Sequence, residues 1–155
     1  MQLTLTGDNG VALKSKQVTV TLGETVTIGE YKISGAGEYD VAGIQCEGAV
    51  TGTTVSYFIW MEDLQFTYVT ALSSEISKLN KASTTHVLIA DIRSDDRPEQ
   101  LIQILKKLEP TYVTLFGAGN TDEFRKLLGL PVQQGSTHKL TRSGLPIEGT
   151  TLLHT

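Results

Sequence analysis

The sequence predicts an α/β (α+β) fold of two stacked mixed β-sheets, with helices mainly on the second sheet. Two observations carry this prediction. Residues 1–50 alternate apolar side chains with threonine, which is typical of antiparallel strands that have one face on a core and one in water. From residue 54 onward, fully apolar runs alternate with segments of helical periodicity. We expect one domain over residues 1–155, with an antiparallel β half at 1–50 and a β/α half at 54–155.

The first half reads as a series of short strands. Asp8-Asn9-Gly10 predicts a tight hairpin turn with positive φ angles, and residues 44–50 predict a later strand. Because threonine fills the alternate positions, we expect the outer face of the first sheet to be exposed to water. The apolar residues of the strand patterns are Leu3 and Leu5, then Val18, Val20 and Leu22, then Val26 and Ile28.

The second half predicts strands that are buried on both faces. Residues 55–61 and 64–69 form a hairpin across Glu62-Asp63, and further strands are expected at 87–91 and 112–116. Helices should cover the outer face of this sheet, while the first sheet covers the inner face. Trp60 and Phe58 are expected to pack in the core against those helices.

Three helices are expected. The first spans about 73–79, and the second starts near Pro98 with Asp95 or Asp96 as its cap. The third has Asn120 as its cap and Gly129 as its C-terminal stop. The apolar stripes are Leu72, Ile76 and Leu79 in the first helix, Leu101, Ile102, Leu105 and Leu108 in the second, and Phe124, Leu127 and Leu128 in the third.

Composition excludes several classes of function. The chain has 155 residues and a formal charge of −4, and its Lys and Arg residues are scattered, so we expect no nucleic-acid partner. No apolar run approaches the roughly 20 residues that a membrane span needs, and the first residues read directly into a strand. A single cysteine, Cys46, excludes an internal disulfide and a thiolate zinc cage. We therefore expect a cytoplasmic protein with no membrane partner.

The segment Gly35-Ala36-Gly37-Glu38-Tyr39-Asp40-Val41-Ala42-Gly43-Ile44 resembles the Gly-Pro-Gly-Glu-Tyr-Glu…Gly-Val segment of small zinc-dependent hydrolases of the metallo-β-lactamase superfamily. The resemblance continues through the hairpin at 55–70, Leu-Glu-Pro at 108–110 and residues 139–146. It implies a four-layer αββα sandwich. One helical layer is missing here, so the expected fold is a truncated metallo-β-lactamase-like αββα sandwich.

The same resemblance implies a metal site that the sequence does not carry. Family members clamp the metal with a His-x-His-x-Asp-His loop, which is absent. The position of the family's bridging Asp aligns with Ala71, and that of a later His ligand falls in residues 116–119, Phe-Gly-Ala-Gly. We predict a degenerate member that has no metal site and no cofactor, and that is more a pseudo-hydrolase than an enzyme.

Few residues remain that could bind or react. Thr70, Ser73, Asp91 and Asn120 are the polar candidates for a ligand site at the carboxyl edge of the second sheet. Arg93 is expected to pair with Asp91. The other polar residues have ordinary structural explanations: Asp95 and Asp96 as caps, Gly117-Ala118-Gly119-Asn120 as a turn, His86 as a hydrogen-bonded residue, His138 and His154 as surface or edge residues, and Cys46 as a packed thiol.

Three functions are compatible with these residues. The preferred one is a non-catalytic, metal-free protein-interaction or self-assembly module, acting as a homo-oligomer or with a protein partner through its exposed sheet and strand edges. The second is a hydrolase with a rebuilt or partner-completed active site. The third is a small-ligand sensor that uses the vestigial pocket. An open polar pocket would favour ligand binding, and a plugged one would favour surface interaction.

Overall fold

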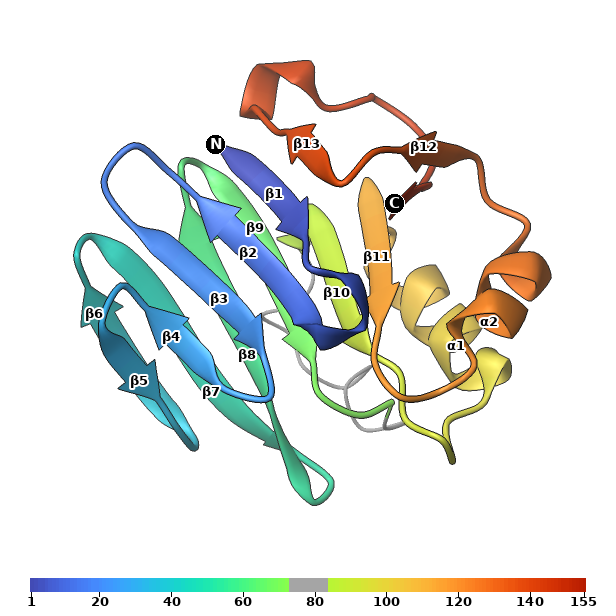
Figure 1. The fold of residues 1–155 in the computed structure, drawn as a ribbon, viewed down its shortest axis with the longest axis horizontal. Coiled ribbons are helices and arrows are strands. Elements are labelled where there is room, and N and C mark those ends of the chain that lie inside the picture. Colours follow the sequence, from blue (N-terminus) through green and yellow to red (C-terminus); the bar gives the residue numbers. More distant parts are fainter. Residues whose placement is uncertain (73–83) are drawn as a thin grey trace.

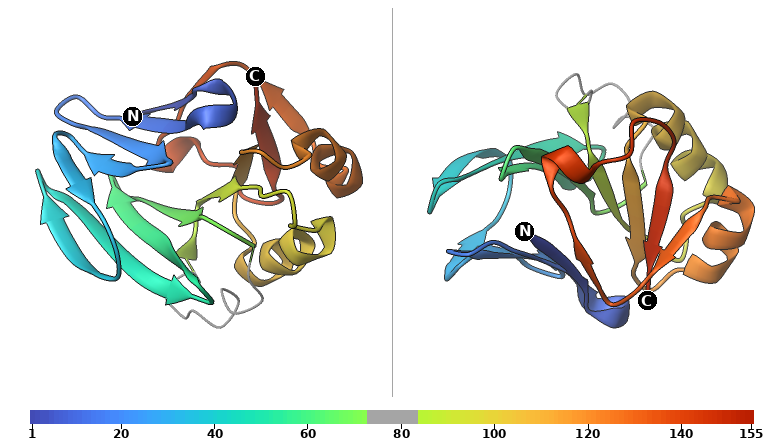
Figure 2. Two further views of the ribbon diagram at one scale, coloured as in Figure 1. Left: turned by 60° about the horizontal axis from the view of Figure 1, so that its bottom comes forward. Right: turned by 90° about the horizontal axis from the view of Figure 1, so that it is seen from above.

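Two β-sheets stack face to face, and the helices of the described chain cover the outer face of one of them (Figures 1 and 2). The computed structural model describes residues 1–72 and 84–155. Ser73 and the helix expected at 73–79 lie outside the described residues. The predicted fold class, two stacked sheets with helices on the second, is confirmed.

The first sheet, sheet A, is antiparallel throughout. Its inner side chains are apolar and buried, whereas threonine and lysine occupy much of the outer face, so its wet outer face agrees with the alternation. The strands in spatial order are β13 (Thr137–Lys139), β1 (Gln2–Leu5), β2 (Gly10–Lys14), β3 (Thr19–Gly23), β4 (Val26–Ile28) and β5 (Tyr31–Ile33).

The second sheet, sheet B, is mixed. Its pairings are parallel from β12 to β9 and antiparallel from β9 to β6. The strands in spatial order are β12 (Val132–Gln134), β14 (Thr151–His154), β11 (Tyr112–Phe116), β10 (Val87–Asp91), β9 (Leu64–Val69), β8 (Thr54–Met61), β7 (Ile44–Thr51) and β6 (Gly37–Val41). β6 and β7 belong to this sheet and β13 to the other, so the change of pattern near residue 54 does not separate the two sheets.

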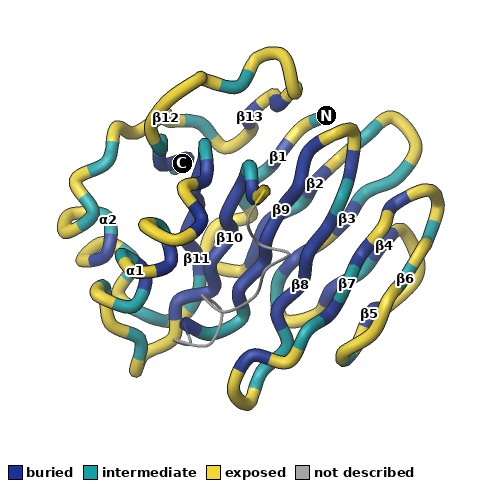
Figure 3. The backbone as a smooth tube through the Cα atoms, turned by 180° about the vertical axis from the view of Figure 1, so that it is seen from behind, coloured by how far each residue is buried: buried dark blue, intermediate teal, exposed yellow. Residues whose placement is uncertain are grey.

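Two apolar cores lie on the two sides of sheet B. The first fills the space between the sheets and includes Leu13, Ile59 and Phe66. The second lies under α1 (Pro98–Leu108) and α2 (Thr121–Leu128) and includes Leu101 and Phe124. The central strands β8 to β11 are therefore the most deeply buried part of the chain (Figure 3).

The helix predictions need three corrections. The N-cap of α1 is Arg97, whose N–H donates to Oε1 of Gln100 at 2.8 Å, rather than Asp95 or Asp96. Its buried stripe is Leu101, Ile104 and Leu108, with Ile102 and Leu105 only half-buried. In α2 Leu127 points to solvent, because it lies off the face that Phe124 centres.

Two other local predictions are decided by the backbone. Asn120 and Gly129 do cap α2: Asn120 accepts from the N–H of Glu123 at 3.1 Å, and Gly129 takes the left-handed conformation. The hairpin predicted at Asp8-Asn9-Gly10 is present, since β1 pairs antiparallel with β2, and Gly10 has a positive φ angle. The turn itself differs from the expected one: the chain makes a 3-10 turn, η1 (Gly7–Asn9), and the second positive φ angle falls on Gly7. A second 3-10 turn, η4 (Arg142–Gly144), precedes β14.

No helix in the described part of the chain has the length and apolar character needed to cross a membrane.

Candidate functional site

The carboxyl ends of the parallel strands β9, β10 and β11 meet at one edge of sheet B. Asp91 is the last residue of β10 and lies beside Phe116, the last residue of β11. This is the place where open α/β sheets bind their ligands. It is also the edge at which Thr70, Asp91 and Asn120 were expected to gather.

Asp91 is a carboxylate held in a nearly closed environment. Only 9% of the residue is exposed. Burial raises the pKa of Asp91; the positive charge of Arg93 lowers it, and the charge of Asp96 raises it again. The ion pair with Arg93, with Nη2 lying 3.1 Å from Oδ2, confirms the expected pairing.

Arg93 contacts the carboxyl ends of both β9 and β10. Its Nε donates to the carbonyl oxygen of Thr70 at 3.0 Å while its Nη2 pairs with Asp91. Its backbone N–H donates to Oδ2 of Asp96 at 2.7 Å, so Asp96 closes the loop after β10 and does not cap α1. The guanidinium therefore places a positive charge beside Asp91, which is the buried carboxylate among the described residues of this edge.

The remaining predicted site residues already have protein partners. The hydroxyl of Thr70 donates to the carbonyl oxygen of Val55 at 2.9 Å, and the side chain of Asn120 is engaged in capping α2. Gly117 fills the space beside Asp91: a Cβ at residue 117 would lie only 2.3 Å from Oδ1 of Asp91. The structure thus joins Thr70 to Asp91 through Arg93 and leaves no room for a side chain at residue 117 beside Asp91. Asn120 lies beyond the glycine loop, where it lines a separate open pocket of about 490 Å³.

The zinc that the resemblance implies does not fit the residues at this edge. Throughout residues 1–72 and 84–155, no group of three or more His, Cys, Asp and Glu side chains is placed to hold a metal ion. Gly117 lies directly beside Asp91, and neither Ala71 nor Gly117 has a side chain that could bind a metal. Asp91 is already paired with a guanidinium and Asp96 accepts from the backbone N–H of Arg93, so the described residues here are a poor ligand set for zinc, whose structural and catalytic sites use three or four side chains.

The three histidines lie on different elements and make separate contacts. His86 precedes β10, at the opposite end of that strand from Asp91, and its Nδ1 accepts from the N–H of Gln65 at 2.8 Å. Burial and then Arg142 lower the pKa of His86, which supports the expected structural role. His138 was expected at the surface or at an edge, and it lies on the edge strand β13 with its side chain buried. Its Nδ1 lies 3.3 Å from Nε2 of Gln133.

A second polar feature lies on the outer face of β6, β7 and β8, and the sequence analysis did not find it. A groove of about 380 Å³ opens there. Asp40 stands opposite Gln45, and Gln45 stands opposite Trp60, so these three side chains form one row across the three strands. The groove is lined by Glu38, Tyr39, Asp40, Gln45, Cys46, Glu47 and Trp60.

Phe58 is buried in the core under the helices, as expected, and Trp60 packs against the margin of that core. It is only half-buried and contributes to the wall of this groove. Cys46 points to the core between the sheets, where burial raises the pKa of its thiol to about 12, in agreement with a packed thiol. The missed signal was the alternation of Glu38, Asp40, Gln45 and Glu47, which puts the polar positions of β6 and β7 on the same face as Trp60.

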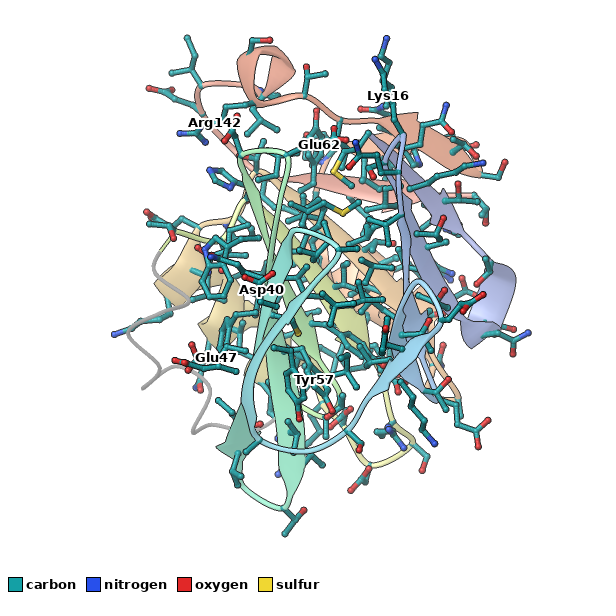
Figure 4. The ribbon with its side chains drawn as sticks, turned by 90° about the vertical axis from the view of Figure 1, so that its left-hand side faces the viewer. Lys16, Asp40, Glu47, Tyr57, Glu62 and Arg142 are labelled. Carbon is teal, nitrogen blue, oxygen red and sulfur yellow. The ribbon has the colours of Figure 1, made fainter. Side chains whose placement is uncertain are left out.

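Figure 4 shows this arrangement from the side of the molecule where β5 and β6 lie. Asp40 and Glu47 lie on the outer side of sheet B, whereas Tyr57 lies on the side that faces sheet A. The outer surface of β6 and β7 therefore carries carboxylates where α1 and α2 cover the other end of the same sheet.

Comparison with known proteins supports the fold. No protein-family model matches the sequence. No curated protein matches it significantly. The structure is similar to the crystal structure, at 2.00 Å resolution, of a presumed zinc-dependent hydrolase of the metallo-β-lactamase superfamily from Thermotoga maritima. The TM-score is 0.73 at 13% sequence identity, over 100% of both chains. The chain therefore has a metallo-β-lactamase-like fold.

Proposed function

We propose that this protein is a non-catalytic, metal-free relative of the metallo-β-lactamase-like hydrolases that works by binding another protein or a second copy of itself. The observation that carries the proposal is the closed edge at Asp91. Arg93 neutralises this carboxylate, and the loop at Gly117 lies directly against it. A hydrolytic site at this position would need a free carboxylate, further metal ligands and room for a substrate.

The similarity to a presumed hydrolase supports the scaffold and does not extend to the reaction. At 13% identity the likeness concerns the arrangement of the strands and helices. The proposed function therefore depends on the surface of the protein. Small-ligand sensing at the vestigial pocket is less well supported, because Arg93 and Gly117 occupy the space beside Asp91.

The test is metal content and turnover measured on one preparation. Purified protein would be analysed for zinc, iron and manganese, then assayed with phosphodiester, ester and lactam substrates with and without added Zn²⁺. The proposal expects less than about 0.1 metal per chain and no turnover above buffer. Stoichiometric metal, or turnover that Asp91→Ala abolishes, would overturn it.

One observation favours a second function, a hydrolase with a rebuilt site. Burial raises the pKa of Asp91, and a general acid needs a carboxyl whose pKa is raised toward neutrality. The same assays decide between the two functions, since turnover in the absence of metal that is lost in Asp91→Ala and retained in Asp96→Asn would establish this alternative.

A further inference from the structure

We propose that the edge strand β6 and the groove beside Trp60 receive an extended, lysine- or arginine-rich segment of a partner protein, which adds as a further strand to sheet B. The inference rests on the proposed binding function and specifies its surface and the chemistry of the partner. Three features of the outer end of sheet B lead to it: an unpaired strand edge, a row of carboxylates and an accessible indole.

The first feature is the edge. β6 is the last strand of sheet B and pairs only with β7, through the five residue pairs from Gly37↔Gly48 to Val41↔Ile44. Along its outer side no other strand of the described chain supplies partners for its backbone N–H and C=O groups. An extended peptide can satisfy such groups by strand addition.

The second feature is charge. Glu38 and Asp40 are both exposed, and they point to the same face because they are two residues apart on a strand. Within residues 1–72 and 84–155 neither carboxylate has an ion pair or a hydrogen-bond partner. Glu47 stands opposite Glu38 and also lines the groove. A segment with basic residues at alternate positions matches this row in sign and in spacing.

The third feature is Trp60. The indole is half-buried and lines the groove together with Asp40 and Gln45. An aromatic face beside carboxylates is a favourable place for an ammonium or guanidinium group, because the ring quadrupole and the negative charges attract the same cation. The groove of about 380 Å³ is large enough for a long basic side chain but not for a folded element.

A second copy of this chain is a poorer occupant of the same edge. If β6 paired antiparallel with β6 of another copy about Tyr39, Glu38 of each chain would face Asp40 of the other. Like charges in directly opposed positions are destabilising. The formal net charge of −4 adds a general repulsion between copies. The edge is therefore protected against self-pairing and open to a basic strand.

The experiment uses the fluorescence of Trp60, which reports directly on the groove because it is the only tryptophan in the chain. The probe is the capped peptide acetyl-Lys-Thr-Lys-Val-Lys-Thr-Lys-amide, titrated into the full-length protein at low salt. Binding is expected to change the Trp60 emission saturably and to weaken several-fold when salt is raised to about 0.5 M. The same peptide with glutamine at every lysine should give no change.

Paired variants separate the groove from the overall charge. Glu38→Gln with Asp40→Asn should weaken binding about tenfold, as expected for the loss of two exposed ion pairs. The matched control is Glu24→Gln with Glu30→Gln, which removes the same charge from turns of sheet A and should leave affinity unchanged. Equal loss in both pairs would overturn the assignment, as would a Trp60 spectrum that does not respond to millimolar peptide.

Strand addition has its own control. Two peptides are made, one N-methylated at the odd-numbered residues and the other at the even-numbered residues. Each keeps every charge but lacks the N–H groups along one edge of the peptide strand. One of the two peptides should lose binding and the other should retain it, because a strand directs alternate N–H groups to each of its two sides. Equal affinity of the two methylated peptides would exclude pairing with β6. Failure of the peptide to bind leaves the metal and turnover measurements unaffected, so the two proposals fail separately.

Discussion

The guanidinium of Arg93 lies 3.1 Å from the carboxylate of Asp91, and its Nε donates to the carbonyl oxygen of Thr70 at 3.0 Å. A side chain of this protein thus supplies the positive charge at the end of β10. The free-energy cost of ionising the buried carboxyl of Asp91 therefore depends on Arg93.

Arg93→Met is expected to lower the free energy of unfolding by about 1–2 kcal/mol near pH 8, because it leaves Asp91 charged and buried without its partner. The pKa of Asp91 is already raised, so its ionisation opposes folding, and this cost is absent below the ordinary pKa and appears as pH rises through the folded-state value. Losing Arg93 raises that pKa further. The effect should therefore shrink toward about pH 4 in urea melts, and a pH-independent loss would contradict the pairing.

Gly117→Ala is expected to destabilise the protein by more than about 2 kcal/mol. A Cβ there would lie 2.3 Å from Oδ1 of Asp91 and 2.5 Å from the carbonyl oxygen of Ile92, at a φ of +116°. Gly129→Ala is the matched control, since residue 129 also has positive φ but has no neighbour within 4 Å. The control should cost about 1 kcal/mol in the same melts, and similar losses for both would argue against the close contact at Asp91.

Several features of the fold and site were predictable because they depend on neighbours in sequence. The run 87–91 gave a strand buried on both faces, and Arg93 lies close enough along the chain to pair with Asp91. Asn120 and Gly129 cap α2 by local hydrogen bonding and backbone conformation. Each of these follows from side chains that are at most a few residues apart.

Other features depend on pairing between distant segments, which periodicity does not reveal. Ile44, Cys46 and Gly48 alternate like the strands of sheet A, yet β7 pairs with β8 of sheet B. The three-residue strand β13 joins β1 across more than 130 residues. The partial exposure of Trp60 was missed for a related reason, because a strand with apolar residues on both faces does not show which part of a face the helices leave uncovered.

Cys46 is expected to be unreactive in the folded protein. Its pKa of about 12 leaves roughly one thiol in ten thousand ionised at pH 8, and only the thiolate attacks disulfide reagents. Ellman's reagent should therefore release colour slowly from native protein, at a rate set by opening of the structure, and at once in guanidinium. Rapid stoichiometric reaction of native protein would mean that the thiol is not packed between the sheets.

The imidazole of His86 is expected to titrate below its ordinary pKa of 6.5, because burial and the charge of Arg142 both disfavour protonation. Stability linked to this group is present above pH 6.5 and is lost as pH falls through the lowered folded-state value. NMR titration of the ring protons should show the low midpoint, and Arg142→Met should raise it. Arg97→Met, a charge removal at the start of α1, should leave it in place.

Thr114 offers a test of the core between the sheets. Its side chain is completely buried, and its hydroxyl has no hydrogen-bond partner among the described residues. Valine has nearly the same shape without the unsatisfied hydroxyl, so Thr114→Val is expected to raise the free energy of unfolding by about 1 kcal/mol. The opposite change is expected for Thr67→Val in the same sheet, because the Thr67 hydroxyl lies 2.6 Å from that of Thr85 and the variant loses this buried hydrogen bond. The urea midpoints of unfolding of the two variants should shift in opposite directions. Destabilisation by Thr114→Val would show that the hydroxyl of Thr114 has a hydrogen-bond partner in solution.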